Sequence, residues 1–357
     1  LFNENPEIRI IWLTNKKELL EQARNAFVEV WNHVGKVPIE VFNIWGTTEK
    51  IPTIPQTKVL VFASYGKLNN LLEKGLELKS DYVFVDEAHQ ILAPTYRTAV
   101  RKVSSTSENE TRIIGLTATP GRGIDETQNV RLVDEFQTDI QGIEFYGDDK
   151  KIYEKKPLQY LEDHEILAKT IPEQLRTEYE FDIPKDKWKS LAELSITTGD
   201  RNEFDEGYFI EMANNNARNI AIVRKLKELA EAGKKILYFS TTKKQSLFIF
   251  TVLQMLGVKA IHVAAETEPV FRRQIVNKFR DTDEISIICN YEIFSAGLDI
   301  PKLDVVFIAR PVNSPVLFNQ MVGRGTRGPK MSGTKTHTLI QVIDGKPSRF
   351  IDFDPYE

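Results

Sequence analysis

Two adjacent carboxylates, Asp86 and Glu87, follow a short apolar run that ends at Val85, and Ala88 and His89 come next. Loops at the carboxyl ends of parallel strands are where open α/β sheets bind ligands, so the acidic pair lies where a nucleotide is expected. Phosphoryl hydrolysis needs a Mg²⁺ ion held by a carboxylate and a group that orients or deprotonates the attacking water. Asp86 can hold the ion through water, and Glu87 can act on the attacking water. Taken alone, the pair fits the acidic N-terminus of a helix equally well.

Hydroxyl side chains follow the next predicted strand along the chain. Thr117 and Thr119 come directly after the apolar run Arg112–Leu116 and just before Pro120. Hydroxyls at a neighbouring strand end can hydrogen-bond to the acidic loop and respond to the state of a bound nucleotide. The alternative is ordinary turn chemistry before a proline.

The second half of the chain carries a pair of basic residues close to Gln320. Arg324 and Arg327 are three residues apart on a segment predicted as a short helix, so both can reach one target. A solvated basic surface is the alternative. Upstream, Gly297 permits a close backbone approach and Asp299 can accept hydrogen bonds, although an ordinary strand-to-helix loop would also contain them.

The elements that must position these residues alternate between short apolar runs and helix-like segments. In the first half, runs rich in β-branched and aromatic residues predict strands over 9–13, 58–62, 82–85 and 112–116. In the second half, strands are predicted over 235–239, 259–263, 285–289, 305–308 and 338–342. Helices are predicted over 17–31 and 216–232. Strand, helix and strand in succession predict an α/β fold with a doubly wound parallel sheet in each half.

Length and composition fit two domains without a membrane span. The 357 residues predict one α/β domain over 1–150 and another over 206–357, joined by a connector or small insertion over 151–205 where the periodicity fades. Because the net charge is only -4, nucleic-acid binding would depend on a local surface. The single Cys289 cannot form an internal disulfide, and no apolar run approaches the roughly 20 residues of a membrane-spanning helix. We therefore expect a cytoplasmic protein.

The order of these segments resembles that of superfamily 2 helicases and translocases of the DEAH type. Residues 86–89 resemble motif II, residues 116–120 motif III, residues 290–301 motif V and residues 320–327 motif VI. The resemblance implies two RecA-like domains in tandem, with ATP and Mg²⁺ in a cleft between them and arginine fingers that stabilise charge on the transferred phosphate. It implies catalytic roles for Asp86, Glu87, His89, Gln320, Arg324 and Arg327, further nucleotide contacts by Gly297 and Asp299, and a coupling role for Thr117 and Thr119.

The same resemblance implies a path for a nucleic-acid strand along the strand ends. Residues 12–15 resemble motif Ia, residues 63–65 motif Ib and residues 236–241 motif IV. By this resemblance the nucleic-acid backbone would be bound by Thr14, Ser64, Ser240, Thr241 and Ser295. Without the resemblance, Thr14 would be interpreted as a routine helix cap and Ser64 as part of a turn.

One segment that the resemblance calls for does not occur in these 357 residues. They contain no G-x-x-x-x-G-K-[ST] sequence, which is the phosphate-binding loop of this family. Because Leu1 falls just before motif Ia, we expect this loop to lie upstream, and we expect the 357 residues by themselves to bind ATP poorly.

The predicted function is that of a nucleic-acid-dependent ATPase, a helicase or translocase that acts on DNA rather than RNA. By analogy with restriction-type and repair helicases, it would be the motor of a restriction, repair or antiviral defence system with further subunits. The alternative is a non-catalytic nucleic-acid-binding or scaffolding protein that has lost ATP hydrolysis. Asp86 and Glu87, together with Arg324 and Arg327, argue against a scaffold, because it has no need for both halves of a hydrolytic site.

Overall fold

A computed structural model describes residues 1–46, 50–104, 111–117, 126–136, 142, 144–154, 156–178, 206–291, 300, 302–312 and 315–344. The chain divides into two compact units, Leu1–Gln141 and Gly142–Glu357, and each unit has its own sheet. Among the described residues, no helix is both long enough and apolar enough to cross a membrane.

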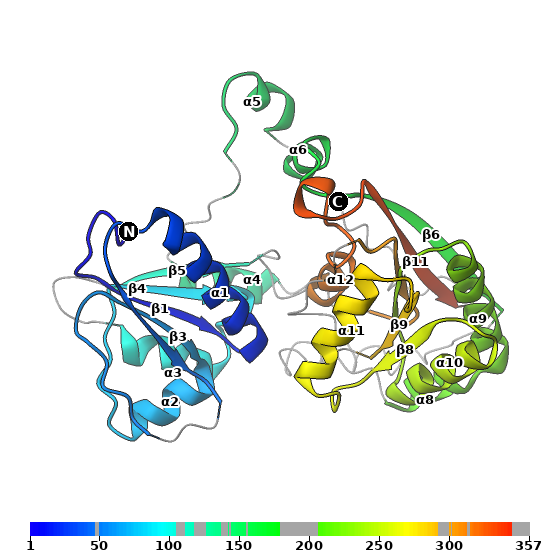
Figure 1. The fold of residues 1–357 in the computed structure, drawn as a ribbon, viewed down its shortest axis with the longest axis horizontal. Helices are drawn as coiled ribbons and strands as arrows, with labels where there is room; N and C mark the ends of the chain where they lie inside the picture. Colours follow the sequence, from blue (N-terminus) through cyan, green and yellow to red (C-terminus); the bar gives the residue numbers. More distant parts are fainter. Residues whose placement is uncertain are drawn as a thin grey trace. The chain divides into compact units, whose positions relative to one another are not determined.

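The first unit is built on a five-stranded sheet with the strand order β2-β3-β1-β4-β5, in which every neighbouring pair is parallel (Figure 1). Its strands are β1 (Arg9–Thr14), β2 (Glu40–Ile44), β3 (Val59–Ser64), β4 (Tyr82–Asp86) and β5 (Arg112–Leu116). The helical segments are α1 (Lys17–Val34), α2 (Tyr65–Glu73), the 3-10 turn η1 (Ala88–Gln90), α3 (Pro94–Val103) and α4 (Glu126–Glu135).

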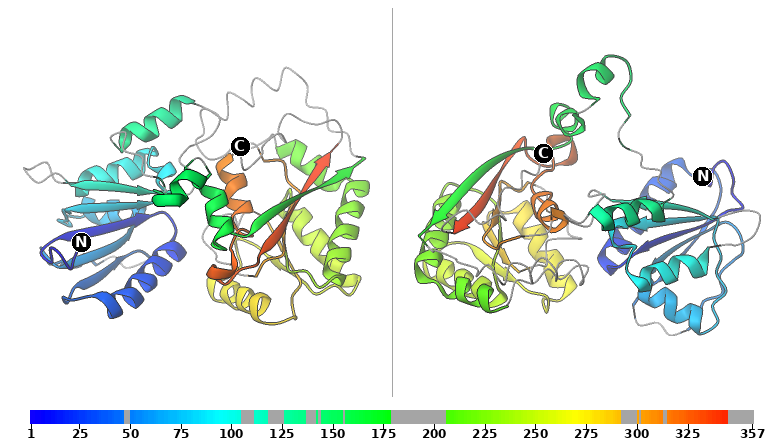
Figure 2. Two further views of the ribbon diagram at one scale, coloured as in Figure 1. Left: turned by 90° about the horizontal axis from the view of Figure 1, so that it is seen from above. Right: turned by 180° about the vertical axis from the view of Figure 1, so that it is seen from behind.

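Both faces of the first sheet are covered, which explains the continuous apolar runs of its central strands. Successive residues of a strand point to opposite faces, so Val59 and Val61 pack on one side and Leu60 and Phe62 on the other. The first side is covered by α2, α3 and α4, and the second by α1 (Figure 2). Helices on both faces of a parallel sheet are the doubly wound arrangement that the sequence predicts.

The second unit contains a six-stranded parallel sheet with the order β6-β11-β10-β7-β9-β8. Its strands are β6 (Lys169–Thr177), β7 (Ile236–Phe239), β8 (Ala260–Val263), β9 (Ile287–Asn290), β10 (Val305–Ile308) and β11 (Thr336–Asp344). Helices α11 (Pro269–Asp281) and α12 (Pro315–Val322) cover one face, and α9 (Asn216–Glu231) and α10 (Lys243–Met255) cover the other. The remaining helical segments are α5 (Gly147–Tyr153), α6 (Pro157–Asp163), α8 (Glu206–Asn214) and the 3-10 turn η3 (Pro329–Met331). The second unit is therefore also doubly wound and RecA-like, and the predicted fold class is confirmed.

Strand β6 lies in the range that the sequence assigns to a connector or small insertion. In the structure it forms the outer edge of the second sheet, parallel to β11. Its residues are all exposed or half-buried, and it contains Pro172, which an edge strand tolerates because one side needs no ladder hydrogen bonds. The strand was not predicted because an edge strand of this kind has no continuous apolar run.

Candidate functional site

The carboxyl edge of the first sheet brings the predicted residues of four strands into one row. Thr14 of β1 is in register with Ser64 of β3. The pairing of β1 with β4 ends at Leu13 and Val85. Asp86, the next residue of β4, therefore lies level with Thr14, on the opposite side of β1 from Ser64. Asp86 in turn pairs with Leu116, directly before Thr117. The acidic pair and the hydroxyls thus lie at the edge where parallel sheets bind ligands.

The acidic pair forms a sharp turn at the end of β4. Glu87 has a left-handed backbone with φ 54° and ψ 49°, a conformation that costs a non-glycine residue about 1–3 kcal/mol. The Asp86 carboxylate accepts a hydrogen bond from the Glu87 backbone N–H at 3.0 Å. Partial burial raises the pKa of the Asp86 carboxyl above its ordinary value, although that hydrogen bond acts in the opposite direction. Since only the 3-10 turn η1 follows, the pair does not begin an α-helix.

His89 is buried and joins the acidic loop to the end of β5. Its Nδ1 lies 3.2 Å from the Thr117 hydroxyl and 3.4 Å from a carboxylate oxygen of Glu87. The imidazole therefore provides one contact between Thr117 and the acidic loop. Thr119 lies outside the described residues.

Two amide side chains that the sequence did not single out extend this network to β1. The side-chain amide of Asn15 donates to Oε1 of Gln90 at 2.6 Å, and Nε2 of Gln90 lies 3.4 Å from Nε2 of His89. The row Asn15, Gln90, His89 and Thr117 thus spans three neighbouring strand ends. The only sign of Gln90 in the sequence is its position directly after His89. That position does not indicate that Gln90 bonds to Asn15, which is 75 residues away.

The hydroxyls predicted to bind nucleic acid in the first unit differ in exposure. Thr14 is fully buried and its hydroxyl has no hydrogen-bond partner among the described residues, so it could reach a strand only if neighbouring segments moved. It does not cap α1 either, because the residue at the N-cap is Lys16. Ser64 is half-buried at the N-cap of α2 and makes no capping hydrogen bond with its side chain. Ser64 is therefore the accessible one of the two.

In the second unit, Ser240 and Thr241 are fully buried and their hydroxyls take part in internal hydrogen bonds. The Ser240 hydroxyl lies within hydrogen-bonding distance of the backbone oxygens of Asn290, at 3.0 Å, and Thr242, at 2.9 Å, and can donate its one hydrogen to either. Thr241 donates to the backbone oxygen of Ala309 at 3.0 Å. These bonds position the loop after β7. Ser295, Gly297 and Asp299 lie outside the described residues.

A buried ion pair that the sequence did not reveal fixes this loop. Arg218 of α9 is completely buried and donates from Nε to both carboxylate oxygens of Asp344, at 2.8 and 2.9 Å. Its other nitrogens donate to the Thr241 hydroxyl at 3.3 Å and to the Ala309 carbonyl. The guanidinium group thereby joins α9 to the ends of β7, β10 and β11.

Replacement of Arg218 by Met is expected to destabilise the second unit by about 3–5 kcal/mol, because the carboxylate of Asp344 would remain buried without its partner. Hydrogen exchange of the β11 amides, which reports the free energy of opening, is the measurement. The control is Lys227→Met, which removes an exposed ion pair with Glu231 and should change that free energy by no more than about 0.5 kcal/mol. Equal protection of β11 in both variants would contradict the assigned role of the ion pair.

The two candidate arginines lie in a loop and not on a helix, so the short helix predicted for them is wrong. Helix α12 ends at Val322, and the amides of Arg324 and Gly325 bond to oxygens three residues back. Gly323 and Gly325 disfavour continuation of the helix, which explains why α12 ends at Val322. Arg327, further along the same loop, forms an isolated antiparallel β-bridge with Leu167. Both arginines are half-buried, as is Gln320 on the helix.

The arginine loop lies against a buried histidine. A Cβ atom at Gly325 would overlap with the His337 ring, so only glycine allows this approach. His337 Nε2 lies 2.7 Å from the Thr170 hydroxyl, and burial lowers the pKa of His337 to about 4. The ring is therefore neutral at pH 7.

Comparisons with known families agree with these features. The model described as "Type III restriction enzyme, res subunit" matches residues 1–122, and the model described as "Helicase conserved C-terminal domain" matches residues 219–328. The chain is 24% identical over 318 residues to IRC3 of Saccharomyces cerevisiae, which is named as an ATP-dependent helicase; the match covers 88% of this chain and 40% of that protein. It is 26% identical over 319 residues to a 51.5 kDa protein of Lactococcus phage (isolate 7-9), covering 89% of this chain and 56% of that protein.

Solved structures share the fold at low sequence identity. A fragment described as an HsdR subunit of a type I restriction enzyme from Vibrio vulnificus YJ016 has a TM-score of 0.58 and 19% identity, covering 99% of this chain and 64% of that one. Dbp5 of S. cerevisiae, bound to RNA and ADP BeF3, has a TM-score of 0.53 and 13% identity, covering 96% of this chain and 73% of that one.

Two tandem RecA-like units define the class of protein to which this chain belongs. Together with both family models and the order of the motifs, they identify it as a superfamily 2 helicase-like protein. The chain spans about half the length of the curated relatives that it matches.

Proposed function

We propose that the full-length protein is an ATP-dependent helicase or translocase that acts on DNA. The observation that carries the proposal is the acidic turn at the carboxyl edge of the first sheet, where the buried His89 contacts both Glu87 and Thr117. A carboxylate that acts on water and is joined to the next strand end is suited to couple hydrolysis to movement.

The residues of this turn fit a magnesium ion that is held mainly by water and phosphate. Partial burial raises the pKa of Asp86, and a hydrated cation would supply the positive charge that this carboxylate lacks. Among the described residues, no group of three or more His, Cys, Asp or Glu side chains could form a larger ligand set. Mg²⁺ usually keeps several waters and binds one or two carboxylates together with substrate phosphates. When bound with ATP, the ion would neutralise charge on the phosphates.

The protein's own groups would carry the rest of the chemistry. Glu87 would orient or deprotonate the attacking water, and His89 would hold Glu87 and Thr117 in place. Arg324 and Arg327 would stabilise charge on the transferred phosphate, with Gln320 close to them in sequence. Gly297 and Asp299 would make further contacts with the nucleotide. Thr117 and Thr119 would relay the state of the nucleotide to the strand-binding loops.

DNA is the proposed substrate because residues 1–122 match a restriction-enzyme family model and the fold is shared with a restriction-enzyme subunit. The same likeness supports a motor that works with further subunits. Phosphate contacts would grip the strand with little sequence preference, so specificity would come from those partners.

The test is ATP hydrolysis by the full-length protein with single-stranded and duplex DNA and RNA, each at saturating concentration. We expect DNA to stimulate turnover more than the matched RNA does. Greater stimulation by RNA would refute the assignment of DNA but not that of the motor. Binding without any turnover would favour a scaffold.

A further inference from the structure

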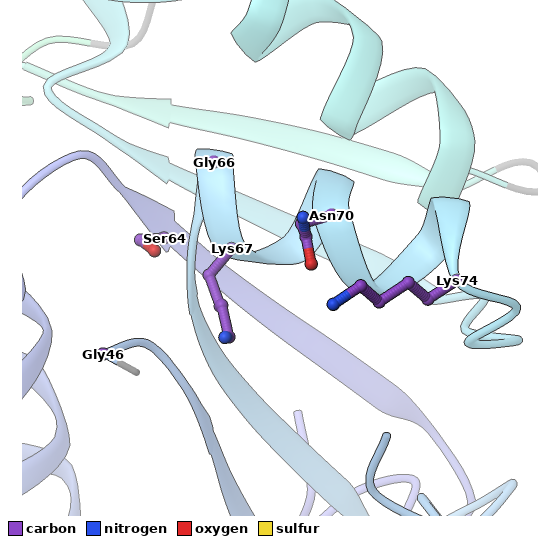
Figure 3. Close-up of a pocket in the computed structure, with 6 residues that line it drawn as sticks. All are labelled: Gly46, Ser64, Gly66, Lys67, Asn70 and Lys74. Atoms are coloured by element: carbon purple, nitrogen blue, oxygen red, sulfur yellow. The ribbon is translucent and has the colours of Figure 1, made fainter. Parts of the chain in front are cut away.

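The functional loops of the two units are held differently. In the first unit, Ser64 borders a pocket of about 400 Å³ beside α2, which is lined by Gly46, Ser64, Gly66, Lys67, Asn70 and Lys74 (Figure 3). In the second unit, the arginine loop, residues 323–328, is in contact with the chain before β6 and with β11. Its position is therefore set by residues outside the loop.

One side of the arginine loop is bonded to the segment that leads from α6 into β6. The Ala168 amide donates to the backbone oxygen of Thr326 at 2.8 Å. The Gly328 amide donates in the other direction, to the backbone oxygen of Ile166, at 2.9 Å. These two bonds lie on either side of Arg327 in the sequence, so they fix the backbone that carries it.

The other side of the arginine loop lies on the second sheet, against His337 of β11. His337 is only 1% exposed and faces the same side of the sheet as Leu339, which packs beneath α12. After α12 ends, the chain passes over the imidazole at Gly325. A Cβ atom at Gly325 would lie 2.9 Å from two ring carbons and closer still to Nδ1, well inside the roughly 3.5–4.0 Å of an ordinary contact.

The imidazole is held in place by β6. Thr170 is the register partner of His337 in the pairing of β6 with β11, and its hydroxyl lies 2.7 Å from Nε2. Nδ1, the ring atom nearest to Gly325, is buried and has no hydrogen-bond partner among the described residues. The backbone of Gly325 is not left-handed, so the ring, and not backbone strain, excludes a side chain at this position.

We propose that His337 and Gly325 are positioning residues, which set how far the arginine loop lies from the sheet and act on ATP turnover through Arg324 and Arg327. The imidazole is the support, and the absent side chain of Gly325 allows the loop to rest on it. This role rests on the proposed function, because it concerns arginines that act as fingers. Groups held in place before the reaction need no rearrangement, whereas a displacement of about 1 Å can cost about 100-fold in rate.

The test combines two opposite changes in size, measured by nucleic-acid-stimulated ATP turnover of the full-length protein. Gly325→Ala places a methyl group against the ring and should lower kcat by about 100-fold with little change in KM. The double variant Gly325→Ala, His337→Ala also removes the ring and should recover about tenfold of that loss. A double variant no faster than Gly325→Ala would refute the steric relation between the two residues.

The matched control is Gly142→Ala in the same unit. Gly142 is exposed, and a Cβ atom there would meet nothing within 4 Å. This variant should keep the kcat of the unmodified protein. An equal loss of kcat in Gly142→Ala and Gly325→Ala would refute the role of the ring.

A second double variant tests whether the effect passes through an arginine. Independent sites give a combined loss equal to the product of the single losses. Because Gly325 is proposed to act through the arginines, the loss in Arg324→Ala, Gly325→Ala should be smaller than that product. A loss equal to the product would refute the positioning role.

Hydrogen exchange of the Ala168 and Gly328 amides reports on the arginine loop without any activity. Gly325→Ala should speed exchange at both amides and leave the amides of β10 unchanged. His337→Ala, which introduces no overlap, should also speed exchange at both, and it decides the matter if Gly325→Ala loses protection throughout β10 and is therefore unfolded. Unchanged exchange at the two amides in His337→Ala would refute the support by the ring.

The two measurements also distinguish the positioning role from the motor function. Faster exchange in both variants, in a protein that hydrolyses no ATP when unmodified, would refute the motor function and retain the support of the loop by His337. Normal turnover in the unmodified protein, with kcat unchanged by Gly325→Ala, would refute the positioning role alone.

Discussion

In the full-length protein, Glu87→Gln is expected to lower nucleic-acid-stimulated ATP turnover by about two to four decades while leaving nucleic-acid binding intact. Glutamine has nearly the same size and can still accept a hydrogen bond from His89, which lies 3.4 Å from the carboxylate in the structure. It cannot take a proton from the attacking water. The measurement is the steady-state rate of phosphate release at saturating ATP, together with oligonucleotide affinity by anisotropy.

The matched control is Glu77→Gln, which removes the same charge from an exposed position after α2. Its turnover should equal that of the unmodified protein. Turnover retained in Glu87→Gln would remove Glu87 from the chemistry. A parallel loss of oligonucleotide affinity in that variant would indicate that the left-handed turn at Glu87 had been disturbed.

Arg324→Ala is expected to lower the same turnover by at most the three to five decades attributed to an arginine finger. The effect would appear mainly in kcat, because a finger acts on charge that develops in the transition state. Arg324→Lys should recover only part of the loss, since an ammonium group lacks the planar fork of a guanidinium group.

Arg224→Ala serves as the control for Arg324→Ala, because Arg224 is an exposed arginine on α9 of the same unit. It should leave kcat unchanged. An unaltered rate in Arg324→Ala would exclude Arg324 from the reaction and leave Arg327 as the candidate, which the corresponding alanine variant then tests.

The strands that lie inside the two sheets could be predicted from the sequence to within a few residues, whereas β2 and β6 could not. The inner strands are covered on both faces, so their apolar residues are continuous and visible in the sequence. Strands β2, β5, β6 and β8 lie at the edges of the sheets, and of these four only β5 and β8 were predicted. The burial patterns of β2 and β6 are mixed, and β6 contains Pro172, so neither has a signal that stands out from a loop.

The candidate site was predictable in its residue types but not in its connections. Asp86, Glu87 and His89 are adjacent in sequence, so one motif shows all three. The left-handed backbone of Glu87 and the bond from Asn15 to Gln90 depend on strands brought together by the fold. The ion pair of Arg218 with Asp344 joins residues 126 positions apart and was invisible for the same reason.

The measurement that tests the central claim most directly is ATP hydrolysis by the unmodified full-length protein, with and without a single-stranded oligonucleotide, in the presence and absence of Mg²⁺. We predict turnover that requires Mg²⁺ and rises when the strand is added. A protein that binds the strand but hydrolyses ATP at the same low rate with and without it would contradict the proposed motor function.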